Sequence, residues 1–238
     1  MSFVIYPTLI EGGIENMATD WWLMERSVLI KQPCFRHYQW KKPEVSFGYG
    51  QDWSKVEKQT GEPVKRLIRR PTGGGIVRHG NDWTYCLALP RSHPTFFMAS
   101  LDLYEDIHRA ISSAFSEQSI KTYLQPCPAD KKAVIPGDCF QEPVGKDLMI
   151  PELEKKIAGA AMKRTKSAIL FQGTVELGLF RDADLNSEKL RNRFIEKVCE
   201  CFQTSPRESH WPDRLQIERE PYCRQFNDLA WRKNRERN

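Results

Sequence analysis

The stretch RRPTGGGIVRHGNDWTY, residues 69–85, connects two predicted β-strands through an unusually bare turn. PVKRLIRR (63–70) leads into it as one strand, and WTYCLALP (83–90) leaves it as another, which Pro90 ends. Three consecutive glycines carry no Cβ, so the backbone can adopt positive φ and another group can approach it closely. An ordinary surface turn seldom needs three glycines in a row. The residues predict either a connecting loop with basic flanks or a cradle for a ligand.

The segments on either side of this stretch indicate the fold class. Apolar residues at helical spacing predict helices over residues 13–31, 101–120 and 187–202. Further strands are expected, and those over 155–164 and 168–177 read as consecutive and antiparallel. Helices and strands mix without the regular alternation of a parallel α/β sheet. The sequence therefore predicts an α+β fold with a mixed, largely antiparallel central sheet flanked by helices.

The composition is that of a globular protein with a full core: of 238 residues, 40% are hydrophobic and 28% are charged. No apolar run approaches the roughly 18 residues that a membrane-spanning helix needs, so no membrane partner is expected. The first residues, MSFVIYPTLIEGG, lack a basic segment and do not read as a secretion signal. The seven cysteines show no repeating spacing, which favours reduced thiols in the cytoplasm over a disulfide framework or a zinc site.

The net charge of +5 is modest, and much of it lies in the terminal stretch WRKNRERN, residues 231–238. This stretch reads as a frayed, solvated tail. The charge is weaker than the concentrated basic stripe of a dedicated nucleic-acid binder, and no RNP-like aromatic set or zinc knuckle accompanies it. No nucleic-acid partner is expected, although a non-catalytic module that binds RNA through the glycine loop is one hypothesis.

The residues around the three glycines indicate a binding site. The glycines match neither G-x-x-x-x-G-K-[ST] nor G-x-G-x-x-G. They could instead form a nest of backbone N–H groups that holds an anion or a polarised carbonyl. Arg69 and Arg70 before the glycines, and His79 after them, therefore predict a site for an anionic or carbonyl ligand. His108, in the second predicted helix, reads as a surface or half-buried histidine rather than a metal ligand, and no metal site is predicted.

Several segments follow one another in a characteristic order: NMATDWWLM, PEVSFGYGQ, RRPTGGGIVRHGNDWTY, KDLMI…KKIAGAAMKR and AILFQGTVEL. In this order they resemble the catalytic domain shared by lipoate-protein ligases, lipoyl or octanoyl transferases and biotin ligases, on the lipoate side. The resemblance covers about residues 13–202. It implies a biotin/lipoate ligase-like catalytic domain over residues 1–206. Residues 207–238 would then be a C-terminal extension with a partly solvated basic tail.

The resemblance also implies where the substrate lies. An acyl chain is expected beside the glycine loop, and Lys156 of the K-I-A-G motif is expected to contact the activated acyl carbonyl or its phosphate. Small residues at 158–161 leave room for an acyl tail, and a cation held beside them can stabilise a developing oxyanion. The implied catalytic residues are Cys139 and Lys156. The implied substrate-binding residues are Arg70, Thr72, Gly73, Gly74, Gly75, His79 and Gly159.

Cys139 bears on how the acyl group would be activated, through an enzyme thioester or through an acyl-adenylate. It lies in PGDCFQEPVGKDL, residues 136–148, which resembles the C-F-x-x-P segment in which one branch of octanoyl and lipoyl transferases keeps its nucleophile. A thiolate nucleophile needs positive charge close by, which Lys156 or His79 could supply. The resemblance therefore implies that an octanoyl or lipoyl group passes from a thioester donor through Cys139 to a lysine of a lipoyl-carrier domain. No cofactor is required for this reaction.

The alternative is an ATP-dependent lipoate-protein ligase that works through an acyl-adenylate and needs ATP and magnesium. Three glycines followed by Ile76 are closer to the ligase form of the loop. Residues 203–238, however, are too few for the separate C-terminal domain that many lipoate ligases use, so the transferase is favoured. The expected acceptor is the glycine-cleavage carrier or a dehydrogenase E2 subunit, and acyl-carrier protein is a possible donor.

Overall fold

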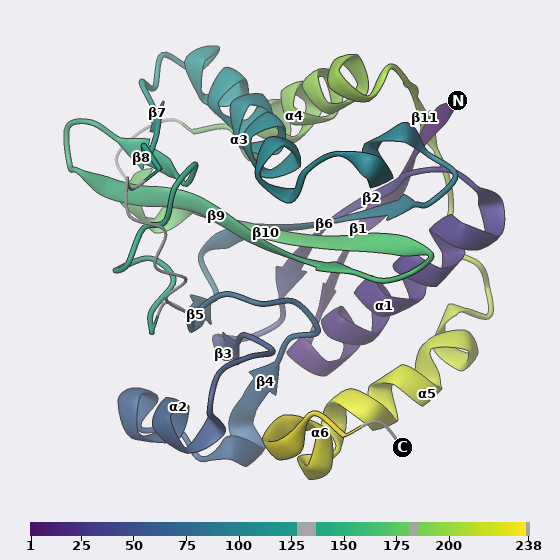
Figure 1. The fold of residues 1–238 in the computed structure, drawn as a ribbon, viewed down its shortest axis with the longest axis vertical. Helices are drawn as coiled ribbons and strands as arrows, with labels where there is room; N and C mark the ends of the chain where they lie inside the picture. Colours follow the sequence, from purple (N-terminus) through teal and green to yellow (C-terminus); the bar gives the residue numbers. More distant parts are fainter. Residues whose placement is uncertain (128–136, 181–184, 237–238) are drawn as a thin grey trace.

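The computed structural model describes residues 1–127, 137–180 and 185–236. Its centre is an eight-stranded sheet in the order β11-β1-β2-β6-β10-β9-β8-β7 (Figure 1). Strand β1 runs parallel to β11 and β2, and the other neighbours in this sheet are antiparallel, which confirms the predicted α+β class. The strands are β1 (Ser2–Glu11), β2 (Cys34–Trp40), β6 (Asp82–Pro90), β7 (Tyr123–Leu124), β8 (Leu148–Ile150), β9 (Lys155–Arg164), β10 (Ala168–Glu176) and β11 (Ser205–Glu208).

Helices cover both faces of this sheet because successive strand residues point to opposite sides. On β1, Phe3 and Ile5 join a core with the helices α3 and α4, whereas Val4 and Tyr6 join a second core with α1 and α5. Figure 1 shows α3 and α4 together above the sheet and α1 with α5 below it. The three predicted helices are confirmed. The helix bounds are α1 (Gly13–Ile30), α3 (Ser100–Ser116), α4 (Ser187–Phe202) and α5 (Leu215–Asn227).

A smaller sheet of three strands, in the order β4-β3-β5, carries the glycine loop at the lower end of the molecule (Figure 1). Strand β4 (Leu67–Arg69) enters the loop and β5 (Val77–His79) leaves it, and both pair with β3 (Glu44–Phe47). Helix α2 (Trp53–Thr60) packs beside them. The loop is therefore supported on both sides by strands, which limits its motion.

The C-terminal segment is folded rather than frayed through residue 234, although most of its residues stay exposed or half-buried. Strand β11 pairs with β1, α5 packs along α1, and α6 (Leu229–Asn234) follows at the base of the glycine loop. Trp231 is fully buried and donates its Nε1–H to the carbonyl of Arg69. In return, Arg69 Nε donates to the carbonyl of Arg232 at 2.8 Å. The C-terminal helices thus hold the strand that leads into the glycine loop.

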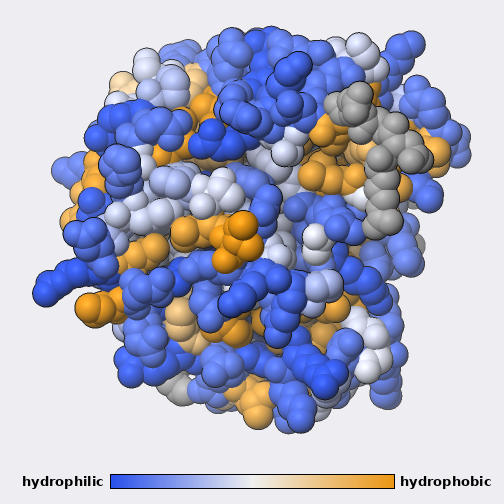
Figure 2. Space-filling model, turned by 180° about the vertical axis from the view of Figure 1, so that it is seen from behind, coloured by the Kyte–Doolittle hydropathy of each residue, from blue (hydrophilic) through white to orange (hydrophobic). Residues whose placement is uncertain are grey.

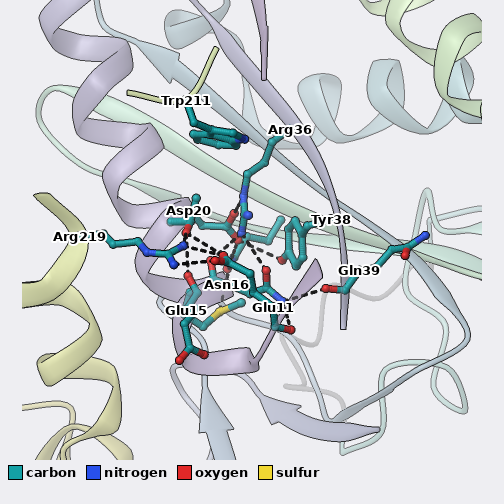
Figure 3. Close-up of polar contacts among 12 residues, drawn as sticks. Glu11, Glu15, Asn16, Asp20, Arg36, Tyr38, Gln39, Trp211 and Arg219 are labelled. Carbon is teal, nitrogen blue, oxygen red and sulfur yellow. Dashed lines mark hydrogen bonds and ion pairs between the residues drawn. The ribbon is translucent and has the colours of Figure 1, made fainter. Parts of the chain in front are cut away.

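A buried polar network links α5 to β1 and α1, and α1 to β2 (Figure 3). Arg219 of α5 reaches Glu11 at 2.6 Å, and both residues are largely buried. Asp20 of α1 accepts a hydrogen bond from Arg36 Nε at 2.7 Å and another from the Tyr38 hydroxyl at 3.0 Å. Charges that are removed from water need such partners, because an unpaired buried charge is strongly destabilising. The C-terminal residues are therefore part of the folded core.

The face seen from behind is mainly hydrophilic, and hydrophobic residues appear on it only in separate small areas (Figure 2). Among the described helices, none is both long enough and apolar enough to span a membrane. His108 departs from its prediction: it is fully buried, and its Nδ1 lies 2.6 Å from the carbonyl oxygen of Lys146. Burial lowers the pKa of this histidine to about 4.

Candidate active site

Arg70 organises the glycine loop from inside. Its Nη2 donates to the carbonyls of Gly73, at 2.9 Å, and Gly75, at 2.8 Å, and its Nη1 donates to Ser46 Oγ at 2.7 Å. Gly74, between these carbonyls, has a φ of 84°, which a residue with a side chain rarely adopts. The triple glycine therefore permits a tight turn around a buried guanidinium.

Two further contacts tie the loop to the rest of the molecule. Tyr49 N donates to the carbonyl of Thr72 at 2.7 Å. The Thr72 hydroxyl donates to Gln172 Oε1 at 2.7 Å, and Gln172 Nε2 donates to Asp20 at 2.6 Å. Gly48 is also required, since a Cβ at this position would collide with the carbonyl oxygen of Gly74. The loop is thereby linked to the network shown in Figure 3.

The residue after the glycines positions Cys139. Ile76 N donates to the carbonyl of Gly137, and Cys139 N donates to the carbonyl of Ile76, both at 2.9 Å. Arg78 adds an ion pair with Asp138 at 3.1 Å. These contacts bring the Cys139 segment, which is distant in sequence, against the glycine loop.

Lys156 of β9 completes the pair that the sequence predicted as catalytic. Its Nζ lies 3.3 Å from Cys139 Sγ and 2.7 Å from Asp147 Oδ2. Lys156 is only 4% exposed and Cys139 is 9% exposed. Burial alone would lower the pKa of the Lys156 ammonium, but the negative charges of Cys139 and Asp147 raise it above its ordinary value. The site therefore keeps a lysine cation in contact with the cysteine sulfur.

Two residues of this site were missed by the sequence analysis. Asp147 is fully buried, and its second carboxylate oxygen accepts a hydrogen bond from the hydroxyl of Tyr104, on α3. Tyr104 lies one residue away from the apolar stripe of its helix, so nothing in the helical pattern marks it. The only sequence feature that marks Asp147 is that an acidic residue directly precedes the short apolar strand β8.

Cys139 stands where two cavities meet. An inner pocket of about 30 Å³ reaches toward the core, and a more open groove of about 460 Å³ reaches the surface. Both share Gly74, Cys139, Ala160 and Ala161. Side chains that line the inner pocket alone include Met17, Tyr38, Trp40, Val77, His79 and Thr174, whereas Ser100, Leu101, Tyr104, Val144, Lys156 and Met162 line only the outer groove.

The polar side chains of the inner pocket are hydrogen-bonded to neighbouring protein groups. The Tyr38 hydroxyl donates to Asp20, and the hydroxyls of Thr84 and Thr174 both donate to Asp82 at 2.7 Å. A polar group that is already paired offers little to a ligand, so carbon atoms and ring faces determine what the pocket binds. The free surface of the inner pocket is therefore mainly apolar, and the pocket must widen before an acyl chain can enter it.

His79 lines the inner pocket and is not the source of positive charge for Cys139. Its Nδ1 lies 2.6 Å from Asp82 and its Nε2 lies 2.6 Å from Ser46 Oγ. The ring stacks on Trp40, with 3.7 Å between the ring centroids. Burial lowers the pKa of His79, so it is neutral near pH 7. The expectation that His79 could supply positive charge is therefore corrected in favour of Lys156.

The other predicted residues gather at the same place. Arg70, His79 and Gly159 line the inner pocket, and Gly73 and Gly75 line the outer groove. Thr72 lines neither cavity but holds Gln172, a residue of the inner pocket. Residues 128–136, which precede the Cys139 segment, lie outside the described part of the chain.

Gly159 has a specific role on β9. A Cβ at this position would lie 2.5 Å from Lys156 Nζ, so the lysine side chain occupies the space that the missing methyl group leaves. We expect Gly159→Ala to displace the ammonium from Cys139 and to lower turnover about 100-fold, in the range of a lost acid–base group. The measurement is kcat for acyl transfer to a carrier. Gly178→Ala is the control, because a Cβ there meets only the end of the flexible Glu176 side chain.

Comparison with known proteins agrees with this geometry. Among similar curated proteins are octanoyltransferase LipM of Geobacillus kaustophilus (strain HTA426) and octanoyltransferase LipM of Bacillus subtilis (strain 168). The first is 34% identical over 193 residues, which cover 76% of this chain and 68% of that protein. The second is 29% identical over 205 residues, which cover 79% and 69%.

Solved structures share the fold. A lipoate-protein ligase A bound with ATP superimposes with a TM-score of 0.72 at 20% identity, over 98% of this chain and 99% of that one. A putative lipoate protein ligase from T. acidophilum, Ta0514, reaches a TM-score of 0.75 at 18% identity, over 98% of both chains. The model of the lipoyl protein ligase A/B catalytic domain matches residues 13–197. The chain therefore belongs to the lipoyl protein ligase A/B catalytic domain family.

Proposed function

We propose that the protein is an acyltransferase that moves an octanoyl or lipoyl group from a thioester donor, through Cys139, to a lysine of a lipoyl-carrier domain. The observation that carries this proposal is the 3.3 Å contact between Cys139 Sγ and Lys156 Nζ at the junction of the two cavities. Relatives at up to 34% identity that are named octanoyltransferase support it. The inner pocket would widen to hold the acyl chain, and the outer groove would admit donor and acceptor in turn.

In the first step the Cys139 thiolate attacks the carbonyl carbon of the donor thioester. Lys156 donates a hydrogen bond to the carbonyl oxygen as negative charge develops there. The new bond joins the acyl carbon to Cys139 Sγ, and the bond between the acyl carbon and the donor sulfur breaks. The donor leaves as a thiolate and takes a proton from Lys156. The enzyme then holds an acyl thioester and a neutral lysine.

In the second step the neutral amine of the carrier lysine attacks this enzyme thioester. A C–N bond forms, the C–S bond to Cys139 breaks, and the thiolate returns beside Lys156. The neutral Lys156 takes the proton that the attacking amine loses, so both the proton and the lysine charge are restored after one cycle. The attacking species is the free amine of the carrier lysine. A base beside Cys139 is useful because the nitrogen must lose a proton as the C–N bond forms.

The reaction as proposed needs neither ATP nor a metal, because the aminolysis of a thioester is downhill. The acceptor would be the glycine-cleavage carrier or a dehydrogenase E2 subunit, and acyl-carrier protein would be a possible donor. One neighbour of known structure is described as a bi-partite lipoate protein ligase with its E2 lipoyl domain, which supports a carrier of this class. The seven cysteines are all unpaired in the structure, which supports a reducing compartment such as the cytoplasm.

The test is intact-protein mass after mixing with an octanoyl thioester in the absence of nucleotide. We expect the wild type to gain one octanoyl group that hydroxylamine removes, and Cys139→Ser to gain none that is labile to hydroxylamine. Addition of a lipoyl-carrier domain should then discharge the adduct onto the carrier. If no adduct forms and the carrier is modified only with ATP, magnesium and free octanoate, the protein is a ligase instead.

A further inference from the structure

The lysine at the centre of the proposed reaction is held in an unusual way for a long side chain. A lysine side chain has four rotatable carbon–carbon bonds and loses rotamer entropy when it is fixed. Lys156 is nevertheless fixed, with its Nζ 2.7 Å from Asp147 and 3.3 Å from Cys139. Among the described residues, these are the two hydrogen-bond partners of its ammonium group. The third N–H is then available to a carbonyl bound beside Cys139.

The Asp147 carboxylate is itself held from several directions. Its Oδ2 accepts from Val144 N at 2.7 Å as well as from Lys156, and its Oδ1 accepts from the Tyr104 hydroxyl. The backbone around it is fixed too, because Gln125 N donates to the Asp147 carbonyl at 2.8 Å. Both carboxylate oxygens are thus occupied, and the side chain has one orientation.

Tyr104 connects this carboxylate to the strand that carries the lysine. Its hydroxyl donates to Asp147 and accepts from the backbone N–H of Ala160, on β9, at 3.0 Å. One hydroxyl of α3 therefore fixes Asp147 relative to β9. Burial, together with the charge of Asp147, raises the pKa of Tyr104, which keeps the hydroxyl protonated as a donor.

We infer that Asp147 and Tyr104 are positioning residues for acyl transfer: they hold the Lys156 ammonium against Cys139 in the orientation from which it can donate to the acyl carbonyl and to the leaving sulfur. This inference rests on the proposed function. Neither residue touches the acyl group in this scheme, because each acts through Lys156. Tyr104 acts one step further away, through Asp147.

The charged groups around Lys156 determine the direction in which its pKa should shift in a variant. Cys139 faces it from its loop, Asp147 from the start of β8, and Tyr104 and His108 from α3. Burial lowers the pKa of His108 to about 4, so this ring is neutral near pH 7. The negative charges of Cys139 and Asp147 are what raise the pKa of Lys156 against the effect of burial. Removal of the Asp147 charge should therefore lower the pKa of Lys156.

The experiment compares Asp147→Asn, Tyr104→Phe and the double variant in single-turnover acylation of Cys139 by an octanoyl thioester. We expect Asp147→Asn to slow acylation about 100-fold, at the lower end of acid–base contributions. Tyr104→Phe should slow it about 10-fold, less than this range, because Tyr104 acts only through Asp147. The alkaline limb of the pH–rate profile should move to lower pH in Asp147→Asn, because the reaction needs protonated Lys156. The double variant should be no slower than Asp147→Asn, since Tyr104 acts through Asp147.

Glu105→Gln is the matched control. Glu105 is next to Tyr104 and makes a 2.8 Å ion pair with Lys146, which is next to Asp147, on the outside of the same two elements. This variant should keep the wild-type rate and pH profile. Equal slowing in Glu105→Gln and Tyr104→Phe would overturn the inference, because simple docking of α3 would then explain both. A wild-type rate and pH profile in Asp147→Asn would also overturn it.

A second readout separates this inference from the proposed function. In protein labelled with ¹⁵N-lysine, the buried ammonium of Lys156 should give a slowly exchanging NMR signal that Lys156→Met lacks. We expect Cys139→Ser to keep the signal and Asp147→Asn to lose it. A signal that is unchanged in Asp147→Asn would count against the inference. If the wild type forms no thioester adduct, the proposed function fails, and the same variants are scored by this signal and by carrier modification with ATP and octanoate.

Discussion

Lys156→Met is expected to lower thioester-driven transfer about 1,000-fold, because it removes both the donor to the developing oxyanion and the proton carrier between the two steps. Methionine has a similar length and no charge, so Cys139 keeps its neighbours but loses the cation that lies 3.3 Å from its sulfur. The measurement is the single-turnover rate of Cys139 acylation, followed by intact mass. Lys155→Met is the control, since Lys155 precedes Lys156 on the same strand and is exposed.

Loss of stability could imitate this effect, and a double variant distinguishes the two causes. Lys156→Met leaves the buried carboxylate of Asp147 without its ion pair, which typically costs about 3–5 kcal/mol. In Lys156→Met/Asp147→Asn the unpaired charge is gone, so the free energy of unfolding should recover toward the wild-type value. Acylation should stay about 1,000-fold slow. Recovery of both stability and acylation in the double variant would show that Lys156 has only a structural role.

Acid should destabilise the protein well above the range in which carboxylates titrate. Burial lowers the pKa of His37 and of His108 to about 4, against about 6.5 for an unfolded histidine. His37 stacks on Trp83, and His108 packs edge-on against Tyr104. Their neutral forms are favoured by folding, so this contribution is complete above pH 6.5 and is lost as the pH falls toward 4.

The expected size is on the order of 2 kcal/mol for each of these histidines between pH 7 and pH 5, or about 4 kcal/mol together. That is a large part of a typical stability of about 5–15 kcal/mol. Urea unfolding at the two pH values measures it directly. His108→Leu should remove about half of the difference. Equal free energies of unfolding at pH 7 and pH 5 would contradict the prediction.

Local pattern was enough to predict the main elements of this fold. The helices α1, α3 and α4 follow from apolar spacing, because burial on one face imposes a period that a short stretch of sequence displays. Strands β9 and β10 were expected as two consecutive strands, and they pair antiparallel. The glycine loop was also recognisable, since three glycines and their basic neighbours form one continuous segment. The order of motifs indicated the family, and the family model bears this out.

The C-terminal helices show what the local sequence pattern does not reveal. Residues 231–238 contain mostly charged and amide side chains and were read as solvated. In the structure Trp231 is fully buried, and the guanidinium of Arg69 is bound to carbonyls of the same helix. A single anchoring tryptophan and hydrogen bonds to main-chain carbonyls leave no periodic signal. A charged residue in a sequence does not show whether another segment of the folded chain will bury it.

By itself the sequence determined the helices α1, α3 and α4, the glycine loop and the two candidate catalytic residues, Cys139 and Lys156. Only the tertiary structure decided that these two meet, through the pairing of Ile76 with the Cys139 segment and the placing of Lys156 over Gly159. It alone decided that Asp147 and Tyr104 hold the lysine and that His79 is a neutral wall residue. The physical reason is that secondary structure follows from neighbours along the chain, whereas ion pairs and pKa values depend on burial and on charges that distant segments bring together.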